Sequence, residues 1–213
     1  MTPLVHNAVS VIAPLAKRLA EDCRIAERPL VLGVSGSPGS GKSTAARLLK
    51  LSLRYHGLNA ARLSLDDLYL SRSGRERTAR DIHPLFRTRG VPGTHDVDLG
   101  ERVLDDVAAG RSLRLPRFDK ANDDLRPVSE WSLIDAPIDL LIFEGWCVGT
   151  NPQCPVDLVE PVNALEREED GDAVWRTHAN ECLAAYGSRL YARVDRFVHL
   201  LAGDIGDTWR WRR

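Results

Sequence analysis

Apolar residues form short runs that alternate with segments of helical periodicity. The runs at residues 29–35, 61–65 and 137–143 are bounded by proline, glycine or polar residues, and each is typical of a buried strand. Residues 43–55 and 99–109 carry apolar positions at helical spacing and are followed by a glycine, which predicts helices. This alternation predicts an α/β fold of the P-loop type, with a parallel sheet that helices cover on both faces.

The remaining segments give weaker patterns. Residues 5–25 predict an amphipathic leading helix, and residues 112–115 and 197–202 predict further strands. Residues 71–94 and 119–131 are polar with little apolar content, so we expect two long loops there. Long loops in a compact domain are usually functional or mobile.

Length and charge limit the possible classes of protein. The chain has 213 residues, which suits one domain over residues 1–213, with residues 1–28 as a leading helical segment and a short C-terminal lid or helical region. The net charge of −1 excludes a global positive field of the kind that attracts nucleic acid or anionic membranes. We therefore expect a small-molecule partner.

The cysteines and the N-terminal charges bear on the compartment. The four cysteines form no C-x-x-C pair and have no zinc-like spacing, so neither a disulfide framework nor a metal knuckle is indicated. Charged residues interrupt the first 30 positions, which leaves no apolar run for a signal peptide or a membrane span. These features predict a cytoplasmic protein.

A glycine-rich motif links the strand at 29–35 to the helix at 43–55. It satisfies G-x-x-x-x-G-K-[ST], in which glycines let backbone N–H groups surround a β-phosphate, lysine reaches the β- and γ-phosphates and serine ligates magnesium. A chance glycine-rich turn is the alternative, which the preceding strand and following helix disfavour. We expect ATP and Mg²⁺ here, with the nucleotide bound by Gly36, Ser37, Pro38, Gly39, Ser40, Gly41, Lys42, Ser43 and Thr44.

Acidic residues follow two of the predicted strands. Asp66 and Asp67 come after the strand at 61–65, where they are either catalytic or simply a helix cap or solvated turn. Glu144 closes the strand at 137–143, and an acid in that position is costly unless it is paired or on a metal. Phosphoryl transfer to an alcohol needs a base and a metal-binding acid. We expect the base among the two aspartates and the metal at Ser43 and Glu144.

Arginines and histidines give weaker signals. The arginines between Arg72 and Arg89 could bind an anionic substrate, but the acids Glu76 and Asp81 among them also suit an exposed mixed-charge loop. The histidines lack metal-ligand spacing. His95, in a loop bounded by glycine and proline, is the one histidine that we keep as a site candidate.

Five segments together resemble one family. They are G-S-P-G-S-G-K-S at 36–43, L-D-D-L-Y-L at 65–70, R-G-V-P-G-T-H-D at 89–96, L-P-R-F-D-K at 115–120 and F-E-G-W-C-V-G at 143–149. In combination they resemble the P-loop kinases that include uridine kinase, phosphoribulokinase and pantothenate kinase, and within these the D-glycerate 3-kinase branch and its bacterial relatives. The resemblance implies a kinase that transfers the γ-phosphate of ATP to a small metabolite, D-glycerate or a similar hydroxy acid.

The resemblance also implies roles for individual residues. Asp66 matches the first acid of the family's D-x-[FL]-Y pattern and is the expected general base, with Lys42 and Glu144 as the other catalytic residues and Asp67 as second choice for the base. Further residues of the matching segments are expected to contact the acceptor: Asp67, Tyr69, Arg89, His95, Asp96, Asp119, Lys120 and Arg126.

Two departures from the family pattern and two other functions remain open. Residues 118–126 lack the glycines usual before the arginine, so acceptor specificity can differ, and Arg210 and Arg212 are lid arginines only if the short C-terminal segment closes over the phosphates. A nucleotide-dependent switch is the alternative function, although the N-K-x-D motif of GTPases is absent because Phe118 replaces its asparagine. A protein that binds nucleotide but has lost its chemistry is a third possibility, against which Lys42, Ser43, Asp66 and Glu144 argue.

Overall fold

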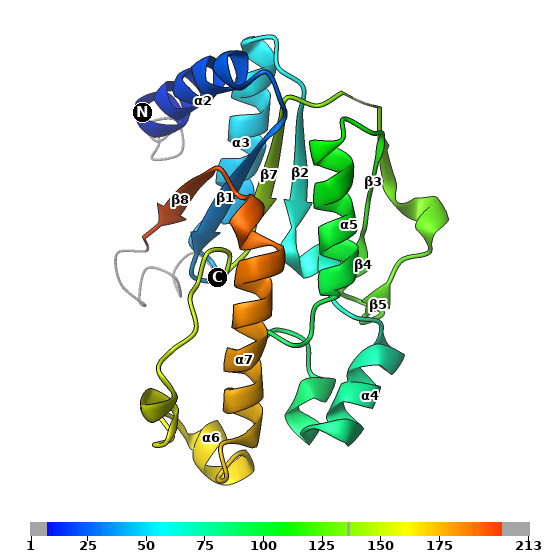
Figure 1. Cartoon of the computed structure of the whole chain (residues 1–213), viewed down its shortest axis with the longest axis vertical. Helices are drawn as coiled ribbons and strands as arrows, with labels where there is room; N and C mark the ends of the chain where they lie inside the picture. Colours follow the sequence, from blue (N-terminus) through cyan, green and yellow to red (C-terminus); the bar gives the residue numbers. More distant parts are fainter. Residues whose placement is uncertain (1–7, 136, 202–213) are drawn as a thin grey trace.

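The centre of the molecule is a four-stranded parallel sheet. The computed structural model describes residues 8–135 and 137–201, and in it the strands β1 (Leu30–Gly36), β2 (Ala60–Ser64), β7 (Leu140–Glu144) and β8 (Arg196–Leu200) lie in the order β2-β7-β1-β8 (Figure 1). Every residue of β1 and β7 is buried, as their continuous apolar runs predict for strands covered on both faces. The predicted α/β architecture and parallel sheet are confirmed.

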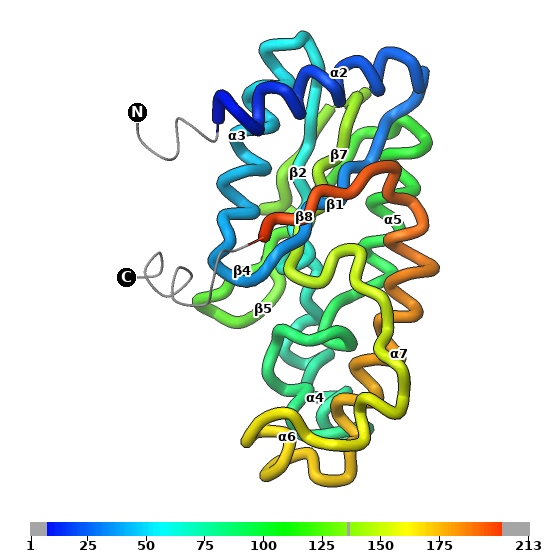
Figure 2. Tube along the Cα trace, turned by 90° about the vertical axis from the view of Figure 1, so that its left-hand side faces the viewer, coloured from blue at the N-terminus to red at the C-terminus, as the bar shows by residue number. Residues whose placement is uncertain are grey.

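Helices pack on both faces of this sheet. On one face lie a short π-helical turn (Ala8–Ile12), α2 (Ala13–Ala26) and α3 (Lys42–Tyr55), and on the other lie α5 (Val97–Ala108) and α7 (Val174–Arg189) (Figure 2). Successive residues of β1 serve opposite faces: Leu30 and Leu32 pack with α2 and α3, whereas Val31 packs with the α5 side. The two cores therefore hold the carboxyl ends of β1, β2 and β7 at one edge.

Two small antiparallel pairs lie outside the central sheet. The predicted strand at 112–115 is β3 (Leu113–Leu115), but it pairs antiparallel with β6 (Ser132–Ile134) and does not join the parallel sheet. The stretch predicted as a loop at 119–131 contains the hairpin of β4 (Phe118–Asp119) and β5 (Asp124–Leu125) and a 3-10 turn, η4 (Val128–Glu130). Strands this short leave no recognisable alternation in the sequence.

The prediction of a loop over residues 71–94 is wrong. The segment holds α4 (Arg72–Asp81), capped by the Ser71 hydroxyl, and a 3-10 turn, η3 (Pro84–Arg87). Its buried side chains include Arg75, which is only 1% exposed and forms an ion pair of 2.6 Å with Asp123 of the hairpin. Because an arginine takes the place of an apolar core residue, α4 shows no apolar stripe.

The C-terminal third adds helices that the sequence patterns did not indicate. They are η5 (Pro155–Leu158), α6 (Ala164–Glu169), α7 and η6 (Tyr191–Arg193). Earlier in the chain, the short 3-10 turn η2 (Leu65–Leu68) follows β2. The first half of α7 lies with α4 and α6 at the lower end of the molecule, below the central sheet (Figure 1). Within the described ranges no helix has the length and apolar character needed to span a bilayer. The predicted lid arginines Arg210 and Arg212 lie outside the described residues.

Candidate active site

The glycine-rich loop joins β1 to α3 at the edge where the strands end. Gly36, Gly39 and Gly41 have positive φ values of 153°, 87° and 87°. A Cβ on Gly36 would lie 2.6 Å from the Leu200 carbonyl oxygen, so this position requires glycine. The loop is therefore held in the compact form that the motif predicts.

Polar groups of the loop are placed as an anion site. Lys42 Nζ donates to the carbonyl oxygens of Gly36 and Ser37, both at 2.8 Å, and burial lowers the pKa of Lys42. The Ser40 hydroxyl is buried and has no hydrogen-bond partner among the described residues. An orphaned hydroxyl and a desolvated ammonium beside a helix N-terminus fit a bound phosphate.

Glu144 meets Ser43 where β7 ends. Glu144 is 3% exposed, and its Oε1 accepts hydrogen bonds from Ser43 Oγ at 3.0 Å and from an Arg62 guanidinium nitrogen at 3.0 Å. A serine oxygen and a carboxylate are ligands that magnesium prefers, so the donor set fits the predicted metal. The sequence did not indicate Arg62, because a single arginine in a short strand has no distinguishing pattern.

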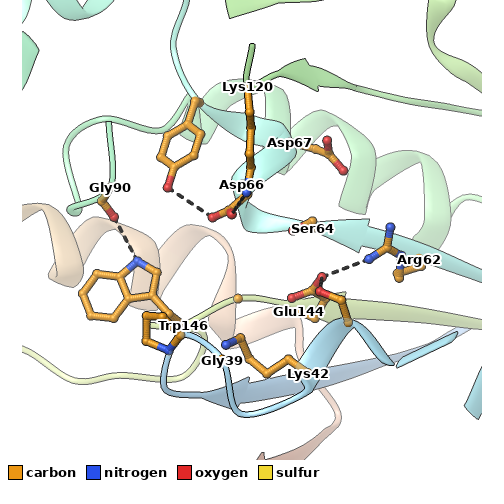
Figure 3. A pocket seen from close by; sticks show the side chains of 14 residues that line it. Gly39, Lys42, Arg62, Ser64, Asp66, Asp67, Gly90, Lys120, Glu144 and Trp146 are labelled. Atoms are coloured by element: carbon orange, nitrogen blue, oxygen red, sulfur yellow. Dashed lines mark hydrogen bonds and ion pairs between the residues drawn. The ribbon is translucent and has the colours of Figure 1, made fainter. Parts of the chain in front are cut away.

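Asp66 lies in η2 directly after β2 and faces the same space (Figure 3). Its Oδ1 accepts from the Tyr69 hydroxyl at 3.1 Å, and its Oδ2 accepts from Lys120 Nζ at 2.6 Å. Burial alone would raise the pKa of Asp66, but the hydrogen bond and charge of Lys120, with the Tyr69 hydroxyl, outweigh burial and hold this pKa below its usual value. Asp66 is therefore ionised.

Asp67 is held differently from its neighbour. Arg117 donates to its Oδ2 at 2.8 Å and the backbone N–H of Phe118 donates to its Oδ1 at 3.2 Å. Both contacts come from residues 117–118, the segment where the chain passes from β3 into β4. Asp67 thus anchors that segment to η2.

The phosphate loop, the Ser43–Glu144 pair and Asp66 open into one cavity of about 790 Å³. Trp146, which follows β7, also lines it, and its indole N–H donates to the Gly90 carbonyl at 2.9 Å (Figure 3). The lining residues are Pro38, Gly39, Lys42, Ser43, Arg62, Ser64, Asp66, Asp67, Tyr69, Gly90, Lys120, Glu144, Gly145 and Trp146.

His95 lies behind this cavity rather than in its wall. Its ring stacks on Tyr69 with the centroids 4.4 Å apart, and its Nδ1 lies 2.9 Å from the Tyr186 hydroxyl of α7. Burial lowers the pKa of His95 to about 3, so the ring is neutral. His95 and Tyr186 therefore support Tyr69, and through it Asp66. Sequence patterns did not indicate Tyr186, which is distant along the chain.

The other predicted acceptor contacts are divided between the cavity and its surroundings. Asp67, Tyr69 and Lys120 line the cavity, whereas four others do not. These four contact other parts of the protein. Arg89 pairs with Asp123, and Asp96 caps α5 by accepting from Leu99 N–H. Asp119 accepts from the N–H groups of Ala121 and Asn122, and Arg126 pairs with Glu130 and Asp119. These four hold the walls of the site in position.

A glycine-rich loop between a parallel strand and a helix, with acids at the ends of the next two strands on one side, β7 and β2, defines a P-loop kinase site. Residues 31–152, more than half of the chain, match the model of the Phosphoribulokinase / Uridine kinase family, and the chain belongs to this family. It is thus a kinase of the small-molecule class, as the sequence predicts.

Individual relatives agree with this assignment. "Uncharacterized kinase mug58" of Schizosaccharomyces pombe is 31% identical over 95% of this chain and 75% of its own length. The chloroplastic D-glycerate 3-kinase of Arabidopsis thaliana is 28% identical over 86% of this chain, which spans 40% of the plant protein. The solved structure of D-glycerate 3-kinase from Cryptococcus neoformans superimposes with a TM-score of 0.78 at 28% identity, covering 94% of this chain and 75% of that one.

Proposed function

We propose that the protein transfers the γ-phosphate of ATP to a hydroxyl group of a small hydroxy acid, D-glycerate or a close analogue. The observation that carries the proposal is that Asp66 and the Ser43–Glu144 pair face one cavity beside the phosphate loop. The plant and fungal relatives described as D-glycerate 3-kinases support the choice of acceptor.

The nucleotide half of the reaction uses the phosphate loop. Backbone N–H groups and the helix N-terminus hold the β-phosphate, and Lys42 exchanges its two carbonyl partners for phosphate oxygens. Ser43 and Glu144 would hold Mg²⁺, which supplies neutralisation of the charge on the β- and γ-phosphates when it is bound. Lys42 then stabilises the charge that develops during transfer.

The acceptor half of the reaction uses Asp66. The acceptor hydroxyl donates its proton to the Asp66 carboxylate while its oxygen forms a bond to the γ-phosphorus. The bond between that phosphorus and the β,γ-bridging oxygen breaks, and its electron pair stays on the β-phosphate of ADP. Tyr69 keeps the carboxylate oriented through its 3.1 Å hydrogen bond.

The test is acceptor-dependent phosphorylation. Purified protein, ATP and Mg²⁺ are incubated with a panel of hydroxy acids, polyols and nucleosides, and ADP release and phosphorylated product are both quantified. The expected result is stoichiometric product with a small hydroxy acid and a rate lower by roughly 100-fold or more with the Asp66→Asn variant. ATP hydrolysis without any phosphorylated acceptor would refute the proposal.

A further inference from the structure

Each acid of the cavity is held by a cation from another part of the chain. Glu144 pairs with Arg62 at 3.0 Å, Asp67 with Arg117 at 2.8 Å and Asp66 with Lys120 at 2.6 Å. The cations differ in exposure: the side chain of Lys120 is 59% exposed, against 27% for Arg62 and 30% for Arg117. An exposed lysine pair is worth little and opens readily, so the Asp66–Lys120 pair is the loosest of the three.

The backbone that carries Lys120 is firmly held. Lys120 lies at the tip of the β4–β5 hairpin, where Asp123 is bound by Arg75 and Arg89, and Arg72 donates to the Asn122 carbonyl at 2.7 Å. Arg89 also contacts the Lys120 carbonyl at 3.4 Å. The hairpin is thus fixed to α4 and to the loop before α5. The Lys120 ammonium group can therefore change position only by rotation about the bonds of its own four-carbon side chain.

While this ion pair is closed, Asp66 is a poor base. Both of its carboxylate oxygens accept hydrogen bonds, and protonating the carboxylate would break an ion pair with Lys120 (Figure 3). The other titratable groups around Asp66 are less able to change partners. Lys42 is bound to the phosphate loop, Cys147 is buried and His95 is buried and neutral.

We propose that Lys120 is a latch released by the acceptor: its ammonium leaves Asp66 for the anionic group of the bound acceptor, and this exchange frees Asp66 to take the hydroxyl proton. This inference rests on the proposed function and adds a specificity rule to it. A neutral acceptor offers no anion to Lys120, so it leaves the base blocked even when its hydroxyl is bound. The preference for an anionic over a neutral acceptor therefore appears in kcat and not only in KM.

The latch also limits wasteful hydrolysis. With no acceptor present, a water molecule beside the γ-phosphate meets a carboxylate that is already paired. Removing the lysine charge should free the base for water as well as for neutral acceptors. A residue that merely binds the acceptor would change KM and leave hydrolysis alone.

The experiment compares D-glycerate with its neutral amide, glyceramide. Steady-state kcat and KM, and acceptor-free ATP hydrolysis, are measured for the wild type, Lys120→Met and Lys120→Arg. The matched control is Arg114→Met, which removes one charge from an exposed position of β3 away from the cavity. For Lys120→Met we expect the acid-to-amide ratio of kcat to fall about tenfold and acceptor-free hydrolysis to rise about tenfold. Arg114→Met should keep the wild-type ratio and hydrolysis rate, whereas Lys120→Arg, which keeps the positive charge, should retain a preference for the acid over the amide.

Each outcome decides the proposal. If Lys120→Met only raises KM for the acid, with the kcat ratio and hydrolysis unchanged, the latch is wrong. If the wild type phosphorylates no hydroxy acid, the proposed function fails. Acceptor-free hydrolysis still tests the latch in that case: an increase in Lys120→Met supports it, and an unchanged rate overturns it.

Discussion

Arg62 is the internal counter-charge of the most deeply buried acid in the site, and replacing it should destabilise the protein. The change Arg62→Met keeps much of the side-chain volume but removes the guanidinium that lies 3.0 Å from Glu144 Oε1. Glu144 is 3% exposed, so its charge would lose its only ion-pair partner in the described structure and would not regain full hydration.

The size of the effect follows from burial. Removing one partner of a fully buried ion pair costs about 3–5 kcal/mol. The Arg62 side chain is 27% exposed and Ser43 still donates to Glu144, so we expect about 2–3 kcal/mol in the nucleotide-free protein. For a domain of this length that corresponds to a fall in Tm of roughly 5–10 °C.

The assay is thermal and urea unfolding without nucleotide or metal. The double variant Arg62→Met/Glu144→Gln has no unpaired charge and should recover most of the lost stability. Arg54→Met, an exposed charge on α3, serves as the control for a charge change alone. A Tm of Arg62→Met within about 1 °C of wild type, or no recovery in the double variant, would refute the assignment of Arg62 as counter-charge.

Three further outcomes follow from the site. Asp66→Asn should lower phosphoryl transfer roughly 100-fold or more with nucleotide affinity unchanged. Asp67→Asn should mainly lower thermal stability; the reverse pattern would make Asp67 the base and Asp66 the structural anchor. Gly36→Ala should abolish nucleotide binding measured by calorimetry, because its Cβ would lie 2.6 Å from a carbonyl oxygen. His95 has a folded pKa of about 3 against an ordinary value of 6.5, so the unfolded chain binds its proton first. The free energy of unfolding of the wild type should therefore fall as pH drops from about 6.5 towards 3. Urea unfolding measured at a series of pH values should show a weaker dependence of this free energy on pH for His95→Gln; an equal dependence in both proteins would contradict the assignment.

Local signals in the sequence were sufficient for the central sheet and the phosphate loop. The strand, loop and helix at residues 29–55 are contiguous, and the motif needs backbone N–H groups and side chains from that segment alone. Asp66 and Glu144 could be anticipated for a similar reason. Each directly follows or closes a buried strand, and carboxyl ends of parallel strands share one edge.

The misjudged segments share a physical cause. The helix α4 was missed because it buries Arg75 against Asp123, and an ion pair leaves no apolar periodicity in either partner's sequence. The strand β3 was found, but its pairing with β6 was not, because pairing direction depends on where the chain returns 17 to 21 residues later. Patterns within one segment carry no information about such partners.

The sequence by itself determined the class of protein, the nucleotide loop and the acids that face it, because these depend on residue type and on spacing within single elements. Only the tertiary structure decided which cation holds each acid: Arg62 for Glu144, Arg117 for Asp67 and Lys120 for Asp66. Those pairs join residues 50 or more positions apart, so folding alone creates them. Their charges and exposures set how firmly each acid is held.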